Sequence, residues 1–105
     1  LRCHARDKDG QTALHEAAYM GHCVIGRLLL KHGAPIDDAD GHGKTPLHCA
    51  TSSGDLDTVR LLLKHPAVDG SDAAALRCCA RDKDGWTALH EAAYRGNTEI
   101  CRLLL

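Results

Sequence analysis

The chain has 105 residues, of which 44% are hydrophobic and 26% are charged. This length suits one small domain and excludes a large enzyme, and the composition is too apolar for a disordered chain. The net charge of −1 provides no positive field for phosphates, so no nucleic-acid partner is predicted, and no apolar run is long enough to span a membrane.

The first predicted unit begins at Thr12, whose hydroxyl can accept from free backbone N–H groups at a helix start. A short, Ala-rich helix is predicted over 13–20, and Gly21 suits its end because glycine readily adopts positive φ. Apolar residues at helical spacing then predict a second helix over about 23–32. The unit is therefore predicted to be two antiparallel helices.

The same signals return further along the chain. Thr45 is followed by Pro46, which has no N–H to leave unpaired at the first helical position, and a second helix is predicted over about 56–64. Thr87 starts a third unit, whose second helix is predicted over about 98–105. Three units of one kind are thus expected.

Self-similarity decides the fold class. Thr-Ala-Leu-His at 12–15 recurs as Thr-Pro-Leu-His at 45–48 and as Thr-Ala-Leu-His at 87–90, at intervals of 33 and 42 residues. Each copy is followed by a glycine at a fixed offset and then by three leucines. A period near 33 with this tetrapeptide is typical of ankyrin repeats, and the whole chain resembles that family.

The resemblance implies an all-α fold, an ankyrin-repeat α-solenoid of stacked helix-turn-helix units with projecting finger turns. Repeat 1 is expected over about 7–39, repeat 2 over about 40–75, and a truncated repeat 3 over about 82–105. The nine additional residues of the longer interval, around 66–74, predict an extended finger, with a helical turn started by Asp72 as N-cap.

A second level of repetition joins the two ends of the chain. Residues 1–30 and 76–105 are identical at 23 of 30 positions, which indicates that a two-repeat block was duplicated. The chain starts with Leu1 and stops at Leu105 within a predicted helix, so we expect a fragment of a longer array.

The six cysteines and eight histidines raise the question of a metal site. Neither Cys-x-x-Cys nor a paired His spacing occurs, so no metal is predicted, and core packing of the cysteines is favoured. The thiols are expected to be reduced and mostly buried, with Cys79 as the exception, in a cytoplasmic or nuclear protein. In ankyrin repeats the histidine equivalent to His15, His48 and His90 bonds within its turn and to the next repeat.

Catalysis and small-molecule binding are not predicted. The loop at 41–45 ends like a phosphate-binding loop, but Asp38 stands where that motif needs glycine. The segments at 7–16 and 82–91 resemble calcium loops but lack the first ligand, because Ala5 or Ala80 occupies its position. No nucleophile, general base or carboxylate pair stands out, so we predict no enzyme, no cofactor and no small-molecule substrate.

The predicted function is the binding of a partner protein or peptide. In the family, the finger turns and the exposed side of the first helix line a concave groove. The positions that this resemblance assigns to partner binding are Lys8, Gln11, Tyr19, Met20, His42, Lys44, Ser52, Ser53, Lys83, Trp86, Tyr94 and Arg95.

Three alternatives are left open by the sequence. The chain is either a free-standing binding module or a substrate-recruiting or scaffolding segment of a larger enzyme or channel, and a metal- or redox-responsive array is a weaker third reading. Within the groove, Trp86 replaces Gln11 of the first copy, and it either anchors a partner or covers a neighbouring turn.

Overall fold

The computed structural model describes residues 2–66 and 72–105, and within them every regular element is helical. In chain order these are η1 (Arg2–His4), α1 (Ala13–Met20), α2 (Cys23–Lys31), α3 (Pro46–Ser53), α4 (Leu56–Lys64), α5 (Ala73–Cys79), α6 (Ala88–Arg95) and α7 (Thr98–Leu104). The predicted all-α class and the predicted helix pairs are confirmed.

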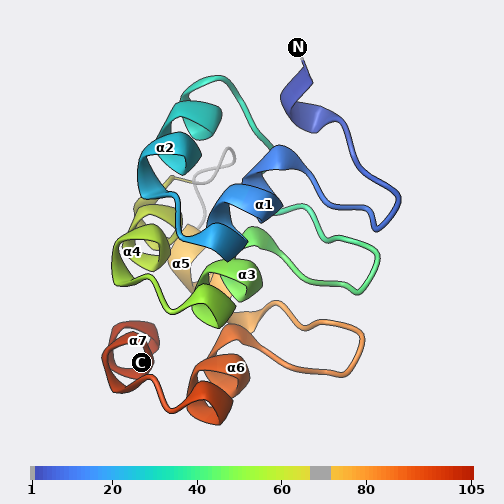
Figure 1. Cartoon of the computed structure of the whole chain (residues 1–105). Coiled ribbons are helices and arrows are strands. Elements are labelled where there is room, and N and C mark those ends of the chain that lie inside the picture. The colour runs from blue at the N-terminus through green and yellow to red at the C-terminus, as the bar shows by residue number, and fades with distance from the viewer. Residues whose placement is uncertain (1, 67–71) are drawn as a thin grey trace.

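The helices form two layers. Figure 1 shows α1, α3 and α6 stacked in an inner layer, with α2, α4 and α7 in an outer layer and three turns projecting from the inner helices. Within each layer neighbouring helices pack on one another, α1 on α3 and α3 on α6, then α2 on α4 and α4 on α7. This is the stacked solenoid that the repeats predict.

Each inner helix starts with the same reciprocal cap. The Thr12 hydroxyl accepts from the backbone N–H of His15 at 3.4 Å, and the Thr12 N–H donates to Nδ1 of His15 at 3.2 Å. The same capping box opens α3 and α6. Each inner helix ends at a glycine in the left-handed region, such as Gly21 with φ of 72°, where a side chain would be strained.

The core is aliphatic and lies between the layers. Small alanines on the inner helices let these helices approach closely, and larger side chains fill the space behind them. The most buried of these side chains are Leu14, Leu47, Val59, Leu62 and Ile100, with Ala18, Ala50, Ala88 and Ala92.

Part of the predicted finger extension is a helix. Residues 67–71 lie outside the described residues, but α5 follows at once, and its N-cap Asp72 accepts from the N–H of Ala75 at 3.2 Å. The turn that leads to α6 is closed by a bond from Asp82 N to Trp86 O of 2.9 Å, as in the first repeat. The predicted helical turn with Asp72 as its N-cap is therefore confirmed, whereas most of the predicted finger extension around 66–74 lies outside the described residues.

Arg77 fastens α5 to the end of α4. Its side chain is 3% exposed, and Nε donates to a carboxylate oxygen of Asp37 at 2.8 Å. Nη1 donates to the carbonyls of Leu62, at 2.9 Å, and His65. Because Pro66 has no N–H, the Leu62 carbonyl has no helical donor four residues on. The guanidinium of Arg77 supplies the donor that this carbonyl would otherwise lack.

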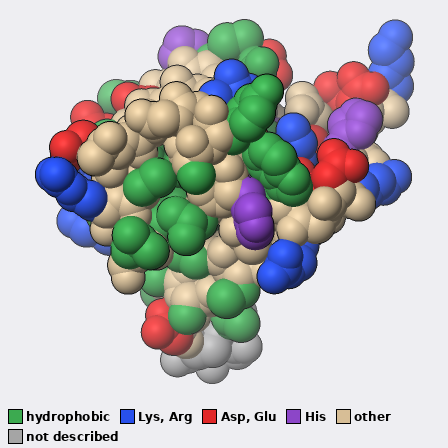
Figure 2. Space-filling model, turned by 90° about the horizontal axis from the view of Figure 1, so that it is seen from below, with side chains coloured by type: hydrophobic (Ala, Val, Ile, Leu, Met, Phe, Trp, Pro, Cys, Tyr) green, Lys and Arg blue, Asp and Glu red, His purple; other side chains and the backbone are tan. Residues whose placement is uncertain are grey.

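The two ends of the array carry apolar surface. Figure 2 shows hydrophobic side chains gathered on the end formed by α6 and α7. At the other end, Ile25 and Leu28 of α2 are exposed. Their equivalents in repeat 2, Thr58 and Leu61, are buried and half-buried. In a solenoid such surfaces are the ones that stacking covers.

Gly26 offers a test of packing in the outer layer. It lies inside α2, where glycine costs about 1 kcal/mol relative to alanine. An added Cβ would meet only Leu61 at 3.5 Å and Leu14 at 3.9 Å, which are ordinary contacts. We expect Gly26→Ala to raise the free energy of unfolding by about 0.5–1 kcal/mol in urea denaturation. A loss of stability would show that the two leucines cannot accept the methyl group.

Candidate functional site

Carboxylates shape the projecting turns. In the second turn, Oδ1 of Asp40 accepts from the backbone N–H groups of His42, at 2.8 Å, and Lys44, at 2.9 Å. Burial alone would raise the pKa of Asp40, but these bonds outweigh burial and hold the pKa below its ordinary value. Asp82 has the same role in the third turn, and its pKa is lowered by N–H groups of Trp86 and Asp84 despite partial desolvation. Charged aspartates thus stabilise the turns.

The histidines of the repeated capping boxes also form hydrogen bonds between successive repeats. Nδ1 of His15 accepts from Thr12, so Nε2 carries the proton and donates to the carbonyl of Lys44 at 2.9 Å. His48 does the same to the carbonyl of Trp86, also at 2.9 Å. The structural role expected of these two histidines is confirmed.

The turn tips are joined through their backbones. The N–H of Gly41 donates to the carbonyl of Asp9 at 2.8 Å, and the N–H of Lys83 donates to the carbonyl of His42 at 3.0 Å. A Cβ on Gly10 would come within 2.7 Å of Gly41 N, so this close approach requires glycine. The side chains of Lys8, His42 and Lys83 are left exposed on the tips.

Trp86 is held in a defined position. Its backbone N–H donates to Asp82 at 3.0 Å, and its carbonyl accepts from His48 of the preceding repeat. The half-buried ring meets Tyr94 edge to face, with centroids 5.5 Å apart and an interplanar angle of 68°, and lies 6.0 Å from the His90 ring. These aromatic contacts are within its own repeat.

Arg95 connects the inner helices α6 and α3. Nε donates to Glu91 at 3.3 Å, and Nη2 donates to the hydroxyl of Ser52 at 3.1 Å. Tyr94, which precedes Arg95, is 76% exposed. Two pairs of predicted site residues are therefore brought together, Trp86 with Tyr94 and Ser52 with Arg95.

The other predicted partner-binding residues differ in their exposure and in the hydrogen bonds that they form. Tyr19 and Met20 are exposed at the end of α1, and Lys44 is half-buried. Gln11 donates to Asp40 at 3.3 Å, so this side chain serves the neighbouring turn. Ser53 bonds back to the carbonyl of Ala50 at 2.7 Å.

The cysteines differ from the prediction in one respect. Only Cys49 is fully buried, whereas Cys3, Cys23, Cys78 and Cys101 are half-buried and Cys79 is exposed. The expectation that most are buried is wrong, because Cys23 and Cys101 lie on the outer helices α2 and α7, Cys3 lies in η1 and Cys78 lies in α5, and none of these four positions is fully covered by neighbouring elements. Among the described residues, no three His, Cys, Asp or Glu side chains gather as a possible metal site.

We expect the thiols to react in the order of their exposure. Burial raises the pKa of the Cys49 thiol to about 12, and burial followed by the influence of Cys79 raises the pKa of Cys78. Because the thiolate is the reactive form, Cys79 should react first with a thiol reagent and Cys49 last. Mass spectrometry of partly labelled native protein measures this order. Early labelling of Cys49 would contradict it.

The comparisons with known proteins agree with this geometry. A family model described as ankyrin repeats in three copies matches residues 1–74, and a second, described as ankyrin repeats in many copies, matches residues 52–105. The chain belongs to the ankyrin-repeat family. Ankyrin repeats are generally non-catalytic modules for protein–protein interaction. The search of curated proteins found no match, and among the described residues no helix of this ankyrin array is long and apolar enough to cross a membrane.

A groove on the outer layer of the array was not predicted from the sequence. It lies between α2 and α4, has a volume of about 420 Å³, and is lined by Cys23, Val24, Arg27, Asp57, Arg60, Leu61 and Lys64. None of the twelve predicted partner-binding residues contributes to it. The available signal was the recurrence of Arg and Lys at 27 and 31 in repeat 1 and at 60 and 64 in repeat 2.

Proposed function

We propose that this ankyrin array binds a partner protein or peptide through the surface formed by its inner helices and projecting turns, here called the inner surface. The observation that carries the proposal lies at the third repeat, where the half-buried Trp86 packs against the exposed Tyr94 and the next residue, Arg95, reaches Ser52 of the preceding repeat. Trp, Tyr and Arg are the residue types most often found as binding hot spots.

The rigidity of this group favours binding. The backbone of Trp86 is bonded on both sides, and its ring is braced by Tyr94. A ring that is already ordered buries a large area on binding while losing little conformational entropy. A partner with an apolar side chain and a nearby carboxylate would match Trp86 and Arg95.

The same surface serves the alternative in which the array recruits substrates within a larger enzyme or channel. The binding event is the same in both cases, and the two differ only in what the array is attached to. We therefore propose partner binding through the inner surface as the function of the described residues themselves.

Hydrogen–deuterium exchange tests the location of binding. A partner found by affinity capture is produced in pure form and mixed with the array, and amide protection is followed by mass spectrometry. We expect added protection in α6 and the turn at 82–86, with less change in α2 and α4. Protection confined to α2 and α4 would overturn the proposal.

A further inference from the structure

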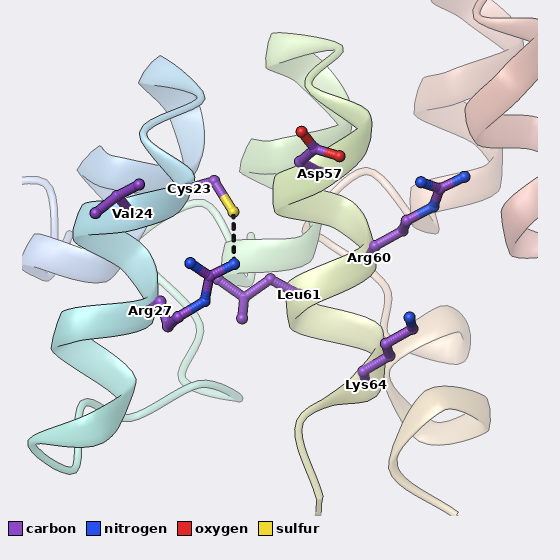
Figure 3. Close-up of a pocket in the computed structure, with 7 residues that line it drawn as sticks. All are labelled: Cys23, Val24, Arg27, Asp57, Arg60, Leu61 and Lys64. Carbon is purple, nitrogen blue, oxygen red and sulfur yellow. Dashed lines mark hydrogen bonds between the residues drawn. The ribbon is translucent and has the colours of Figure 1, made fainter.

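The groove between α2 and α4 lies on the outer layer, away from the projecting turns. Figure 3 shows Arg27 reaching from α2 toward Leu61 of α4, with Arg60 and Lys64 extending from α4. Cys23 and Leu61 lie beside Arg27, Val24 lies on the side of α2 away from Leu61, and Arg60 and Lys64 point away from α2. It is thus a basic groove with apolar walls, separate from the inner surface.

The cations of this groove are not neutralised within the described structure. Neither Arg27, Arg60 nor Lys64 forms a salt bridge among the described residues, and Arg27 donates only to the sulfur of Cys23, at 3.8 Å. One carboxylate, that of Asp57, lies at the start of α4. Lys31 adds a further positive charge beside Val24 and Leu28. The half of the groove toward the helix C-termini is therefore positively charged.

Repeat 3 provides an internal comparison. There Arg102 occupies the position of Arg27, and it pairs with Glu99 at 3.4 Å. In repeat 1 the position of Glu99 is held by Val24, which is 74% exposed. Repeat 1 thus carries an apolar side chain where repeat 3 carries a carboxylate. Arg27 is therefore available to bind a carboxylate of a partner, and Val24 adds apolar surface beside it.

We propose that the α2–α4 groove binds an acidic peptide segment of a partner protein, one that places carboxylates on Arg27, Arg60 and Lys64 and apolar side chains on Val24 and Leu61. Charge complementarity identifies the carboxylates. The apolar walls favour a peptide over a bare polyphosphate, because phosphate groups gain nothing from Val24, Leu28 or Leu61. This is a second binding surface in addition to the inner surface proposed above.

The test uses a short fluorescein-labelled peptide in which pairs of glutamate alternate with leucine, titrated with the whole chain and followed by fluorescence anisotropy at low salt. We expect saturable binding that weakens with added salt. Arg27→Glu combined with Arg60→Glu should weaken binding at least about tenfold. Val24→Glu, which recreates the pair of repeat 3, should weaken it about threefold by occupying Arg27 and removing an apolar contact.

Controls separate this groove from general charge attraction and from the inner surface. Lys8→Glu combined with Lys83→Glu changes the net charge equally but lies on the turn tips, and Trp86→Ala removes the inner-surface aromatic. Both should leave binding of this peptide unchanged. An equal loss in the lysine double variant, or tighter binding of a labelled single-stranded DNA of the same charge, would overturn the proposal.

A direct map on the parent protein does not depend on any variant folding. Methyl NMR signals of Val24, Leu28 and Leu61 should shift when the peptide is added, while those of Leu14 and Leu47 in the core should not. Shifts confined to residues of α1, α3 and α6 would place the peptide elsewhere and overturn the proposal. That result would leave the inner surface as the peptide site.

Discussion

Arg77→Met is expected to lower the free energy of unfolding by about 2–4 kcal/mol. The methionine fills a similar volume, but the carbonyls of Leu62 and His65 lose their charged donor at the end of α4. Asp37 loses its partner from α5 as well. For a domain of this size, such a loss lowers the melting temperature by about 10 °C or more, measurable by circular dichroism.

Asp37→Asn is the matched control for Arg77→Met. The side chain of Asp37 is 61% exposed, so water replaces much of what the ion pair contributes, and the expected cost is only about 0.2–1 kcal/mol. Arg77→Lys should fall between the two, because lysine keeps the charge without the planar fork. Equal destabilisation by Arg77→Met and Asp37→Asn would show that the ion pair, rather than the carbonyl bonds, holds α5 in place.

Trp86→Ala is expected to lower the affinity for the partner of the inner surface at least about tenfold, since truncation of a hot-spot side chain costs about 2 kcal/mol or more of binding free energy. The variant removes the ring that Tyr94 braces edge to face. Isothermal titration calorimetry with the purified partner measures the change. The fold should survive, because the bonds made by Trp86 to Asp82 and His48 are backbone bonds.

The duplicated repeat supplies the control for Trp86→Ala. Gln11 holds the equivalent position in repeat 1, and its side chain bonds to Asp40 of the neighbouring turn. Gln11→Ala should therefore change partner affinity much less than Trp86→Ala. If both folded variants bind like the parent, the inner surface around repeat 3 is not the recognition surface.

The features that the sequence predicts well are those decided by neighbouring residues. The Thr12 cap, the glycine that ends α1 and the apolar spacing of α2 are all local, and the structure has them where the sequence places them. The interval of 33 residues then determines how the units stack, because each helix pair repeats the geometry of the one before.

The features that the sequence does not predict depend on long-range contacts. Arg77 meets Asp37 across a separation of 40 residues, through α5, a helix that the inner repeat pattern does not contain. The charge of the outer groove is visible in the sequence as the recurring Arg27 and Arg60, but the sequence does not show that, of the equivalent arginines, Arg102 pairs with Glu99 while Arg27 and Arg60 form no salt bridge among the described residues. That distinction becomes meaningful only once α2 and α4 are side by side.

The backbone bonds between turn tips have a consequence for how specificity can change. Main-chain bonds join Asp9 to Gly41 and His42 to Lys83, so each tip keeps its place as long as the glycines at the contact, such as Gly10, are kept. The side chains at 8, 42 and 83 can therefore be substituted without disturbing the backbone bonds between the turns. Divergence of the tips alone would let duplicated copies of this block acquire new partners while the stack beneath them stays the same.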